Sequence, residues 1–438
     1  MSQLSRWWRV GAAMLVALAL PGFTLPGSAG PAGPVTIGFL EKWPEPQYAP
    51  YFHKVVADYQ QLHPNVTIDL QAVADQPYKD KIRVMTAAGA LPDIFFAWPG
   101  DFATKFVRAG LAADLTKAFY GSDWHTRLGQ GPVEAFTYRG RLYGIPMDVQ
   151  AKFFTYNVAI FRHNGIVPPK TLPELFAACD KLKRNGVAPL GFGNTFGWPA
   201  IHYITTLNSV YVPQAVLQRD YTPETGEFTD SGYVQALATL KQLLDTCMVS
   251  PTQANGVTND AAIAEFQTGR TAFMYNNNYW FPYFTTSGGA PSTIVDNWNY
   301  FKFPSVPGAR GDQAFLTGAP DGFMVSSRTK HMDVVIDFLQ FFTSKSNAQL
   351  MTKMLGWGSP VIGSATAENT FPLLRQSIDD INQARGMAVW LDTATNALVA
   401  QAYLAGTEGL INGTKTPGQV MKSVQEAAQA AKKEVTGK

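Results

Sequence analysis

Residues 140–193 constrain the fold of this 438-residue chain more than any other segment, because strand, turn and helix signals follow one another closely there. The segment reads GRLYGIPMDVQAKFFTYNVAIFRHNGIVPPKTLPELFAACDKLKRNGVAPLGFG. Its Gly-Arg-Leu-Tyr-Gly start is typical of a hairpin, and the apolar run that follows predicts a buried strand ending at Tyr156-Asn157. A short helix around Ile160 and a break at Pro168-Pro169 come next.

The break leads into a helix with clear start and stop signals. Thr171 and Glu174 form the T-x-x-E pattern of a capping box. Lys183 and Arg184 fall in the expected last turn, and Gly186 is the expected stop. A strand followed by a capped helix predicts an α/β fold. Ordinary α/β segments share this order, so the order alone does not indicate a particular family.

The N-terminus has the features of a Sec-type signal peptide. Arg6 and Arg9 precede an apolar run at residues 10–20, which is too short for a membrane anchor. Small residues then predict cleavage after Ala29, with Ala32 as the alternative. No cysteine lies near the cut, which excludes a lipoprotein anchor. Two tryptophans separate the two arginines, so the adjacent arginine pair of a twin-arginine signal is missing. We therefore expect residues 1–29 to be removed and the protein to reside in the periplasm of a two-membraned bacterium.

Composition agrees with a globular chain that can bury two cores, since 46% of its residues are hydrophobic. The net charge of +2 gives no indication of the strongly basic surface that nucleic-acid-binding proteins have. Aromatic residues make up 13% of the chain. Most of them are expected in the core, but some could stack on sugar rings in a binding site.

Motifs of catalysis and metal binding are missing from the sequence. The six histidines lack zinc-ligand spacing, and there is no G-x-S-x-G elbow, P-loop or dinucleotide fingerprint. Glu41, Asp101 and Asp148 could pair as glycosidase carboxylates, but a chain with 33 acidic residues offers many such pairs. We expect no catalytic residues, no metal and no cofactor.

Four further segments extend the pattern over most of the chain. Residues 52–73 predict a helix and a strand, 78–115 a helix, a Pro-Asp turn and a buried strand, and 333–344 an amphipathic helix. Residues 263–280 read IAEFQTGRTAFMYNNNYW. In this order the segments resemble the extracellular solute-binding proteins of ABC sugar importers, the group that includes maltose-binding protein, although Phe273 stands where that group has Met.

The resemblance implies the two-lobed α/β fold of type II periplasmic binding proteins, in which neither lobe is continuous in sequence. Lobe one is expected to comprise residues 34–148 and 302–345. Lobe two is expected to comprise residues 150–300 and 346–438. About three crossings would join the lobes, and a hinge would close them around a ligand.

Ligand residues are expected at strand ends that face the interlobe cleft. The candidates, placed by strand ends and by the resemblance, are Glu41, Lys42, Trp43, Trp98, Asp101, Asp148, Trp198, Asn276, Asn277, Trp280, Asp321 and Trp357. Three adjacent amides at residues 276–278 predict a loop, because Asn is a poor helix and strand former.

Several candidates also have a purely structural interpretation. Trp98 and Trp357 could pack in the core, and Glu41 could cap a helix. Asp148 could brace the hinge by accepting backbone N–H groups. Trp390 could line the cleft but is expected to be structural.

The candidate set favours a neutral sugar or polyol, because carboxylates and amides accept hydrogen bonds from hydroxyls. An anionic ligand would require Arg or helix N-termini, and Lys42 is the only candidate base. A polyamine is compatible with the same acids. The expected partners are this ligand and ABC permease subunits in the inner membrane, with the protein itself a monomer. A secreted glycan-active enzyme and a non-transport glycan sensor remain as alternatives.

The two cysteines, Cys179 and Cys247, form a candidate disulfide in an oxidising compartment. The resemblance places both on helices of one lobe. Two separately buried thiols are the alternative, because bridging requires Cα atoms within about 7 Å.

Overall fold

The first of the two larger β-sheets in the computed structural model, which describes residues 33–437, has the strand order β2-β1-β3-β12-β6. The signal peptide expected at residues 1–29 lies outside the described residues. The strands are β1 (Val35–Glu41), β2 (Val66–Ala72), β3 (Ile94–Ala97), β6 (Gly144–Pro146) and β12 (Gly322–Val325). β1 runs parallel to β2 and β3, whereas β12 lies antiparallel between β3 and β6.

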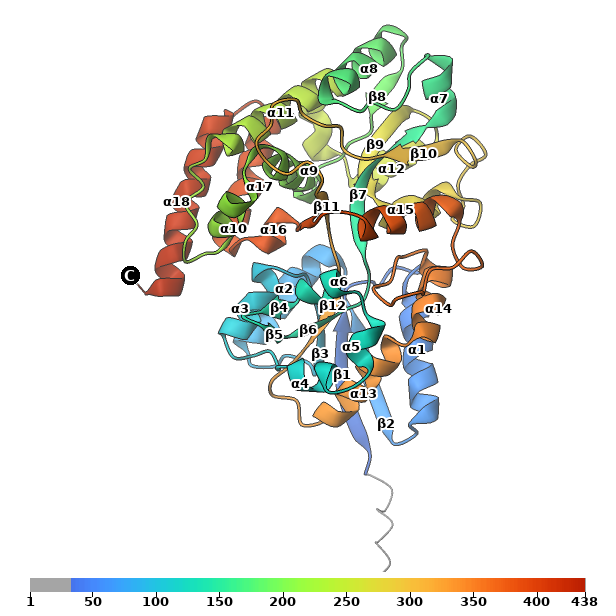
Figure 1. Cartoon of the computed structure of the whole chain (residues 1–438), viewed down its shortest axis with the longest axis vertical. Coiled ribbons are helices and arrows are strands. Elements are labelled where there is room, and N and C mark those ends of the chain that lie inside the picture. Colours follow the sequence, from blue (N-terminus) through green and yellow to red (C-terminus); the bar gives the residue numbers. More distant parts are fainter. Residues whose placement is uncertain (1–32, 438) are drawn as a thin grey trace, which may run out of the picture. The chain divides into compact units, whose positions relative to one another are not determined.

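We call this sheet and the helices that share its core lobe one (Figure 1). Its other elements are α1 (Ala49–Leu62), α2 (Asp75–Ala87), α3 (Asp101–Arg108), α4 (Thr116–Tyr120), α5 (Trp124–Arg127), α6 (Gln130–Glu134), the hairpin β4 (Thr137–Tyr138) and β5 (Arg141–Leu142), α13 (Met332–Phe342) and α14 (Lys345–Leu355). Phe39 on β1 is buried against the rings of Phe323, Phe338 and Phe342. The core of lobe one therefore joins residues almost 300 positions apart.

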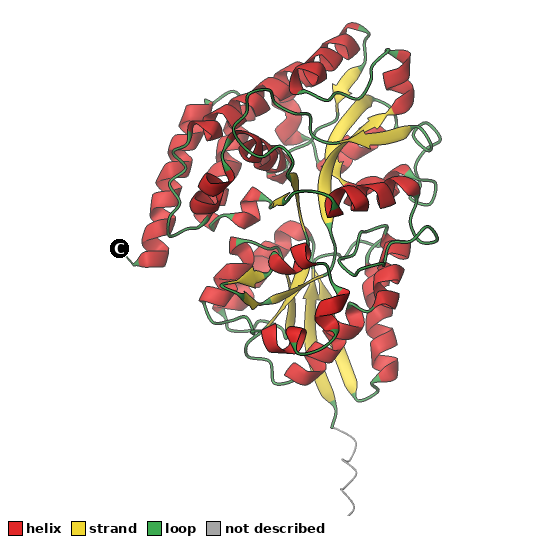
Figure 2. Ribbon diagram, viewed as in Figure 1, coloured by secondary structure: helices red, strands yellow, loops and turns green. Residues whose placement is uncertain are grey.

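The second sheet has the order β13-β11-β7-β9-β8, and β10 pairs with the far end of β7. Its strands are β7 (Gln150–Asn157), β8 (Ala188–Leu190), β9 (Thr271–Asn277), β10 (Trp298–Phe301), β11 (Leu316–Ala319) and β13 (Met387–Ala388). All eight residues of β7 are buried, because other strands flank it on both edges and helices cover it (Figure 2).

We call this sheet and its helices lobe two. The helices are α7 (Val158–His163), α8 (Leu172–Arg184), α9 (Trp198–Tyr211), α10 (Gln214–Tyr221), α11 (Ser231–Cys247), η1 (Pro251–Gly256), α12 (Asn259–Gln267), η2 (Asn278–Phe284), α15 (Pro372–Asn382), α16 (Leu391–Ala394), α17 (Ala397–Ile411) and α18 (Pro417–Thr436). In α8 the capping box is confirmed: Thr171 accepts from the Glu174 N–H while Glu174 accepts from the Thr171 N–H. Gly186 follows the helix with φ +75°, a left-handed conformation that favours glycine.

The chain passes between the sheets after β6, after β11 and after α14, and two of these crossings meet where the Val149 N–H donates to the Gly358 carbonyl at 2.9 Å. The lobe boundaries expected from the sequence differ from this packing in two segments. β11, expected in lobe one, pairs with β7 and β13 of the second sheet. α14, expected in lobe two, buries Met351 and Leu355 in the core of lobe one. The sequence of a short strand or an amphipathic helix does not indicate which sheet the element joins.

The loop predicted for the three asparagines is wrong. Asn276 and Asn277 end strand β9, and Asn278 begins η2. Tertiary hydrogen bonds outweigh the poor strand propensity of asparagine: Asn276 Oδ1 accepts from the Thr155 hydroxyl at 3.0 Å, and Asn278 Oδ1 accepts from the Ala151 N–H at 3.1 Å.

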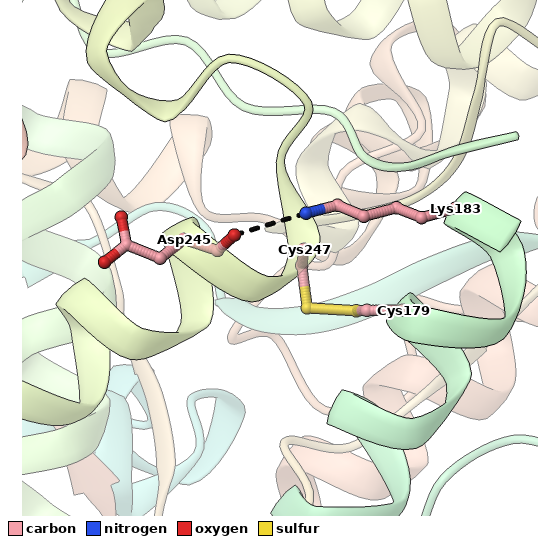
Figure 3. The surroundings of a disulfide bond; sticks show 4 residues. All are labelled: Cys179, Lys183, Asp245 and Cys247. Carbon is pink, nitrogen blue, oxygen red and sulfur yellow. Dashed lines mark hydrogen bonds between the residues drawn. A yellow bond between two sulfur atoms is a disulfide. The ribbon is translucent and has the colours of Figure 1, made fainter. Parts of the chain in front are cut away.

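A disulfide joins Cys179 on α8 to Cys247 at the end of α11 (Figure 3). The Cα atoms are 5.0 Å apart, and both cysteines are fully buried in the core of lobe two. Beside the bond, the Lys183 ammonium donates to the Asp245 carbonyl at 3.2 Å. The two helices are thus held together by a covalent bond and a polar contact.

We expect reduction of this disulfide to lower the melting temperature of the protein. The bond closes a loop of 68 positions, for which chain entropy predicts a stabilisation of roughly 4 kcal/mol. Differential scanning calorimetry of oxidised and reduced protein measures the effect, with mass spectrometry after alkylation to count free thiols. Two alkylated thiols in unreduced protein, or identical melting curves, would contradict the expectation.

Candidate functional site

A cavity of about 790 Å³ lies between the two lobes, and we call it the cleft. Lobe one contributes loops that follow β1 and β3 and the start of α2. Lobe two contributes α9, α12, α16 and the segment from β9 into η2. The lining residues are Lys42, Trp43, Glu45, Gln47, Tyr48, Ala74, Asp75, Pro77, Lys79, Trp98, Gln150, Phe196, Trp198, His202, Thr258, Asn259, Asp260, Ile263, Gln267, Asn277, Tyr279, Trp280, Tyr283, Asp321, Trp390, Asp392 and Thr393.

Aromatic side chains from both lobes line the cleft. On the lobe-one side Trp43 stacks on Phe52 with ring centroids 5.2 Å apart, and Trp98 meets Phe96 edge-on at 4.6 Å. On the lobe-two side Trp390 stacks on His202 at 4.2 Å. Their ring neighbours hold these side chains in place, which gives the cleft rigid apolar walls.

A buried polar network forms the floor of the cleft. The Lys42 ammonium pairs with Asp321 at 3.1 Å, and the Asp321 N–H donates to Asp148 at 2.7 Å. Gln150 donates to Asp321 at 3.2 Å and accepts from the Asn277 amide. Burial raises the pKa of Asp321 and, more strongly, that of Asp148, where the Asp321 charge adds to the effect. Lys42 opposes both shifts, so the floor holds two adjacent carboxyl groups close to one fixed cation.

Four buried oxygens of the cleft have no hydrogen-bond partner among the described residues. They belong to Glu45, Asn277, Asp321 and Asp392. The Asn259 amide nitrogen is a buried donor that likewise has no hydrogen-bond partner among the described residues. Buried polar atoms without partners are costly, so these atoms fit a ligand that supplies several donors and at least one acceptor.

Direct contacts between the lobes border the cleft. Lys79 of α2 pairs with Asp392 of α16 at 3.5 Å. The Tyr283 hydroxyl in η2 lies 2.9 Å from the Tyr48 hydroxyl and accepts from Gln47 at 2.9 Å. These contacts would have to break for the lobes to separate.

The structure brings seven of the twelve sequence-predicted residues together in the cleft wall. They are Lys42, Trp43, Trp98, Trp198, Asn277, Trp280 and Asp321. Glu41, Asp148, Asn276 and Trp357 lie behind the wall, each at most 1% exposed. Glu41 accepts from the Trp43 N–H, and Trp357 packs between Trp43 and Tyr48. These four residues support the wall without lining it.

Asp101 lies away from the cleft. It begins α3, pairs with Arg108 at 2.6 Å and borders a different cavity of about 660 Å³ between α3 and α10. Its position directly after β3 predicted a cleft residue, but the loop turns at Gly100, whose φ of +89° points the next side chain elsewhere.

About three quarters of the lining residues were not predicted as ligand residues from the sequence, among them Glu45, Asp75, Lys79, His202 and Asp392. Trp390, expected to be structural, lines the cleft. His202 and Trp198 lie one turn apart on α9, and that spacing could have indicated a shared face. The other residues come from loops and helix starts that no periodic pattern marks.

Within residues 33–437 no group of His, Cys, Asp and Glu is arranged to hold a metal ion. In the same range no helix has the length and apolar character needed to span a membrane.

Comparison with known proteins identifies the family. The family model described as bacterial extracellular solute-binding protein matches residues 43–349, which is more than half of the chain. The chain belongs to the bacterial extracellular solute-binding proteins. Proteins of this family are the solute-binding components of ABC transporters, act outside the cytoplasm and are not enzymes.

Two curated relatives of this solute-binding protein are similar over different spans. An uncharacterized ABC transporter extracellular-binding protein of Pyrococcus horikoshii is 23% identical over 88% of this chain and 84% of its own length. The alpha-glucosides-binding periplasmic protein AglE of Rhizobium meliloti is 29% identical over 39% of each chain.

Solved structures confirm the type II periplasmic binding protein fold. A chitin oligosaccharide binding protein superimposes with a TM-score of 0.82 at 22% identity, over 91% of this chain and 99% of its own. The maltose/maltodextrin-binding domain MalE of Bdellovibrio bacteriovorus, bound to maltotriose, gives a TM-score of 0.70 at 16% identity, over 90% and 99%.

Burial raises the pKa of Glu41 to about 7, although its bond from the Trp43 N–H favours the ionised carboxylate. The folded protein therefore retains a proton that the unfolded chain releases near 4.5, and stability falls as pH rises from 4.5 through 7. The Glu41→Gln side chain can still accept from the Trp43 N–H. This variant should reduce the pH-dependent loss of unfolding free energy by roughly 2–3 kcal/mol. Chemical denaturation over that pH window measures it, with exposed Glu426→Gln as the control. Parallel pH curves for wild type and Glu41→Gln would refute the assignment.

Proposed function

We propose that this solute-binding protein captures a neutral saccharide or polyol in the cleft and delivers it to an ABC permease. The observation that carries the proposal is the pairing of rigid aromatic walls with buried oxygens that lack partners. Hydroxyl groups can donate to the oxygens of Glu45, Asn277, Asp321 and Asp392, and they can also accept from the Asn259 amide. The apolar faces of a sugar ring can at the same time lie against the tryptophans.

The charges of the cleft argue against an anionic ligand. Its two lysines, Lys42 and Lys79, are already paired with Asp321 and Asp392. Three further carboxylates, Glu45, Asp75 and Asp260, line the same cavity. A phosphate group would be desolvated beside this excess of negative charge.

The sugar-binding relatives support the same ligand class. A cleft of about 790 Å³ falls within the roughly 300–1,000 Å³ typical of small-molecule sites. We further propose that the mature protein is a monomer in the periplasm and that the closed, liganded form is the one that the permease recognises.

A thermal-shift screen against neutral sugars, polyols, polyamines and sugar phosphates tests the ligand class. A ligand at 100 times its dissociation constant should add about 2.7 kcal/mol of stability. We expect a neutral sugar or polyol to give the largest shift and its phosphate ester a smaller one. Tighter binding of the phosphate ester in a direct titration would refute the proposal that acidic side chains surround the ligand. Preference for a polyamine would refute the proposal of a neutral ligand.

Trp280 tests the cleft itself, because its partly buried ring lines the cavity in η2 without belonging to the central core. We expect Trp280→Ala to weaken the best ligand by roughly 1–3 kcal/mol. Isothermal titration calorimetry measures the change, and Tyr120→Ala, an exposed aromatic outside the cleft, is the matched control. Unchanged affinity in a folded Trp280→Ala variant would remove this ring from the site.

A further inference from the structure

A second cavity, of about 250 Å³, lies inside lobe two beside β11 and contains a buried lysine. Lys152 is on β7, is only 2% exposed and lines this cavity. No ion pair or hydrogen bond joins its ammonium to any described residue, and burial alone lowers its pKa to about 7. The rings of Trp198 and Tyr275 lie 5.3 and 5.9 Å from the ammonium, and burial together with the Lys152 charge lowers the pKa of His202.

The rest of the lining supplies hydroxyl groups and positive charge. The Thr206 hydroxyl donates to the His202 carbonyl at 3.0 Å and accepts from Tyr275 at 2.8 Å and from Thr317 at 2.7 Å, so these three hydroxyls are satisfied by one another and by the backbone. Two further cations, Lys302 and Arg385, line it at positions that are 53% and 74% exposed. Their carboxylate partners, Asp380 and Asp312, are not part of the lining, and no Asp or Glu of the described chain is.

A buried ammonium without a counter-charge is strongly unfavourable, so Lys152 keeps its proton at neutral pH only where a negative charge compensates it. Rings at more than 5 Å compensate only a small part of this cost. Here the ammonium and the electropositive lining both favour an occupant that accepts hydrogen bonds and carries negative charge. The volume lies below the roughly 300 Å³ at which ordinary small-molecule sites begin, so the occupant is small.

We propose that this cavity binds a small oxyanion or carboxylate, with Lys152 as the charged ligand. The cavity adjoins the cleft, because the Lys152 ammonium lies beside Trp198 of the cleft wall, but the proposal does not depend on the identity of the transported solute. Lys302 and Arg385 attract the anion, while Lys152 holds it.

Calorimetric titration of the mature protein with inorganic phosphate, acetate and chloride, in a mildly acidic buffer of constant ionic strength, tests the proposal. We expect saturable binding of phosphate or acetate, weakened at least tenfold in Lys152→Met. The control is Lys422→Met, an exposed lysine on α18 that should bind as the wild type does. Without anions, Lys152→Met should melt at a higher temperature than the wild type, because a buried charge is removed.

Arg385→Met keeps the test decisive if Lys152→Met does not fold, since it removes one of the two exposed cations of the lining and should weaken the anion severalfold. Absence of saturable binding to the wild type, or equal affinity in wild type and both variants, would overturn the proposal. Chloride binding as tight as that of phosphate and acetate would overturn the assignment to an oxyanion or carboxylate.

Discussion

The hydrogen bond from the Asp321 N–H to the Asp148 carboxylate ties together two crossings between the lobes. Asp148 follows β6 and Asp321 precedes β12, so one bond fixes both chain passages at the base of the cleft. The same Asp321 carboxylate receives Lys42 from lobe one and Gln150 from lobe two. Since all of these groups are buried, removal of any one would leave a polar atom uncompensated. Hinge, floor and cleft wall therefore depend on one network.

Much of the architecture could be predicted from the sequence because local signals and tertiary packing agree there. The capping box of Thr171 and Glu174 forms as expected, and the apolar run that ends at Asn157 is a strand buried at every residue. The cysteine pairing followed from compartment and count, but only the packing of α8 on α11 decided it. Which sheet a short strand joins was not predictable, as β11 shows, because neighbours distant in sequence determine it.

The cleft was predicted less completely than the fold, for a physical reason. Residues that follow strands, such as Trp98, and conspicuous aromatic residues, such as Trp198, could be assigned to the cleft from the sequence. The sequence could not distinguish lining from supporting residues, because that depends on side-chain direction at single positions. Asp148 shows this: its alternative interpretation as a hinge brace matches the observed bond to a backbone N–H. Lys152 attracted no notice, since one lysine in an apolar run gives no signal until its surroundings are known.

The position of β12 determines when lobe one can complete its fold. This strand lies in the interior of the sheet, yet it comes from residues 322–325, after all strands of lobe two except β13 have been synthesised. Until it inserts, β3 and β6 each expose an unpaired strand edge, and exposed edges promote pairing between chains. Contacts of such long sequence separation also slow folding. The chain is therefore most prone to aggregate after β3 and β6 have been synthesised and before β12 pairs with them. Any factor that protects these two strand edges must bind the chain during that interval.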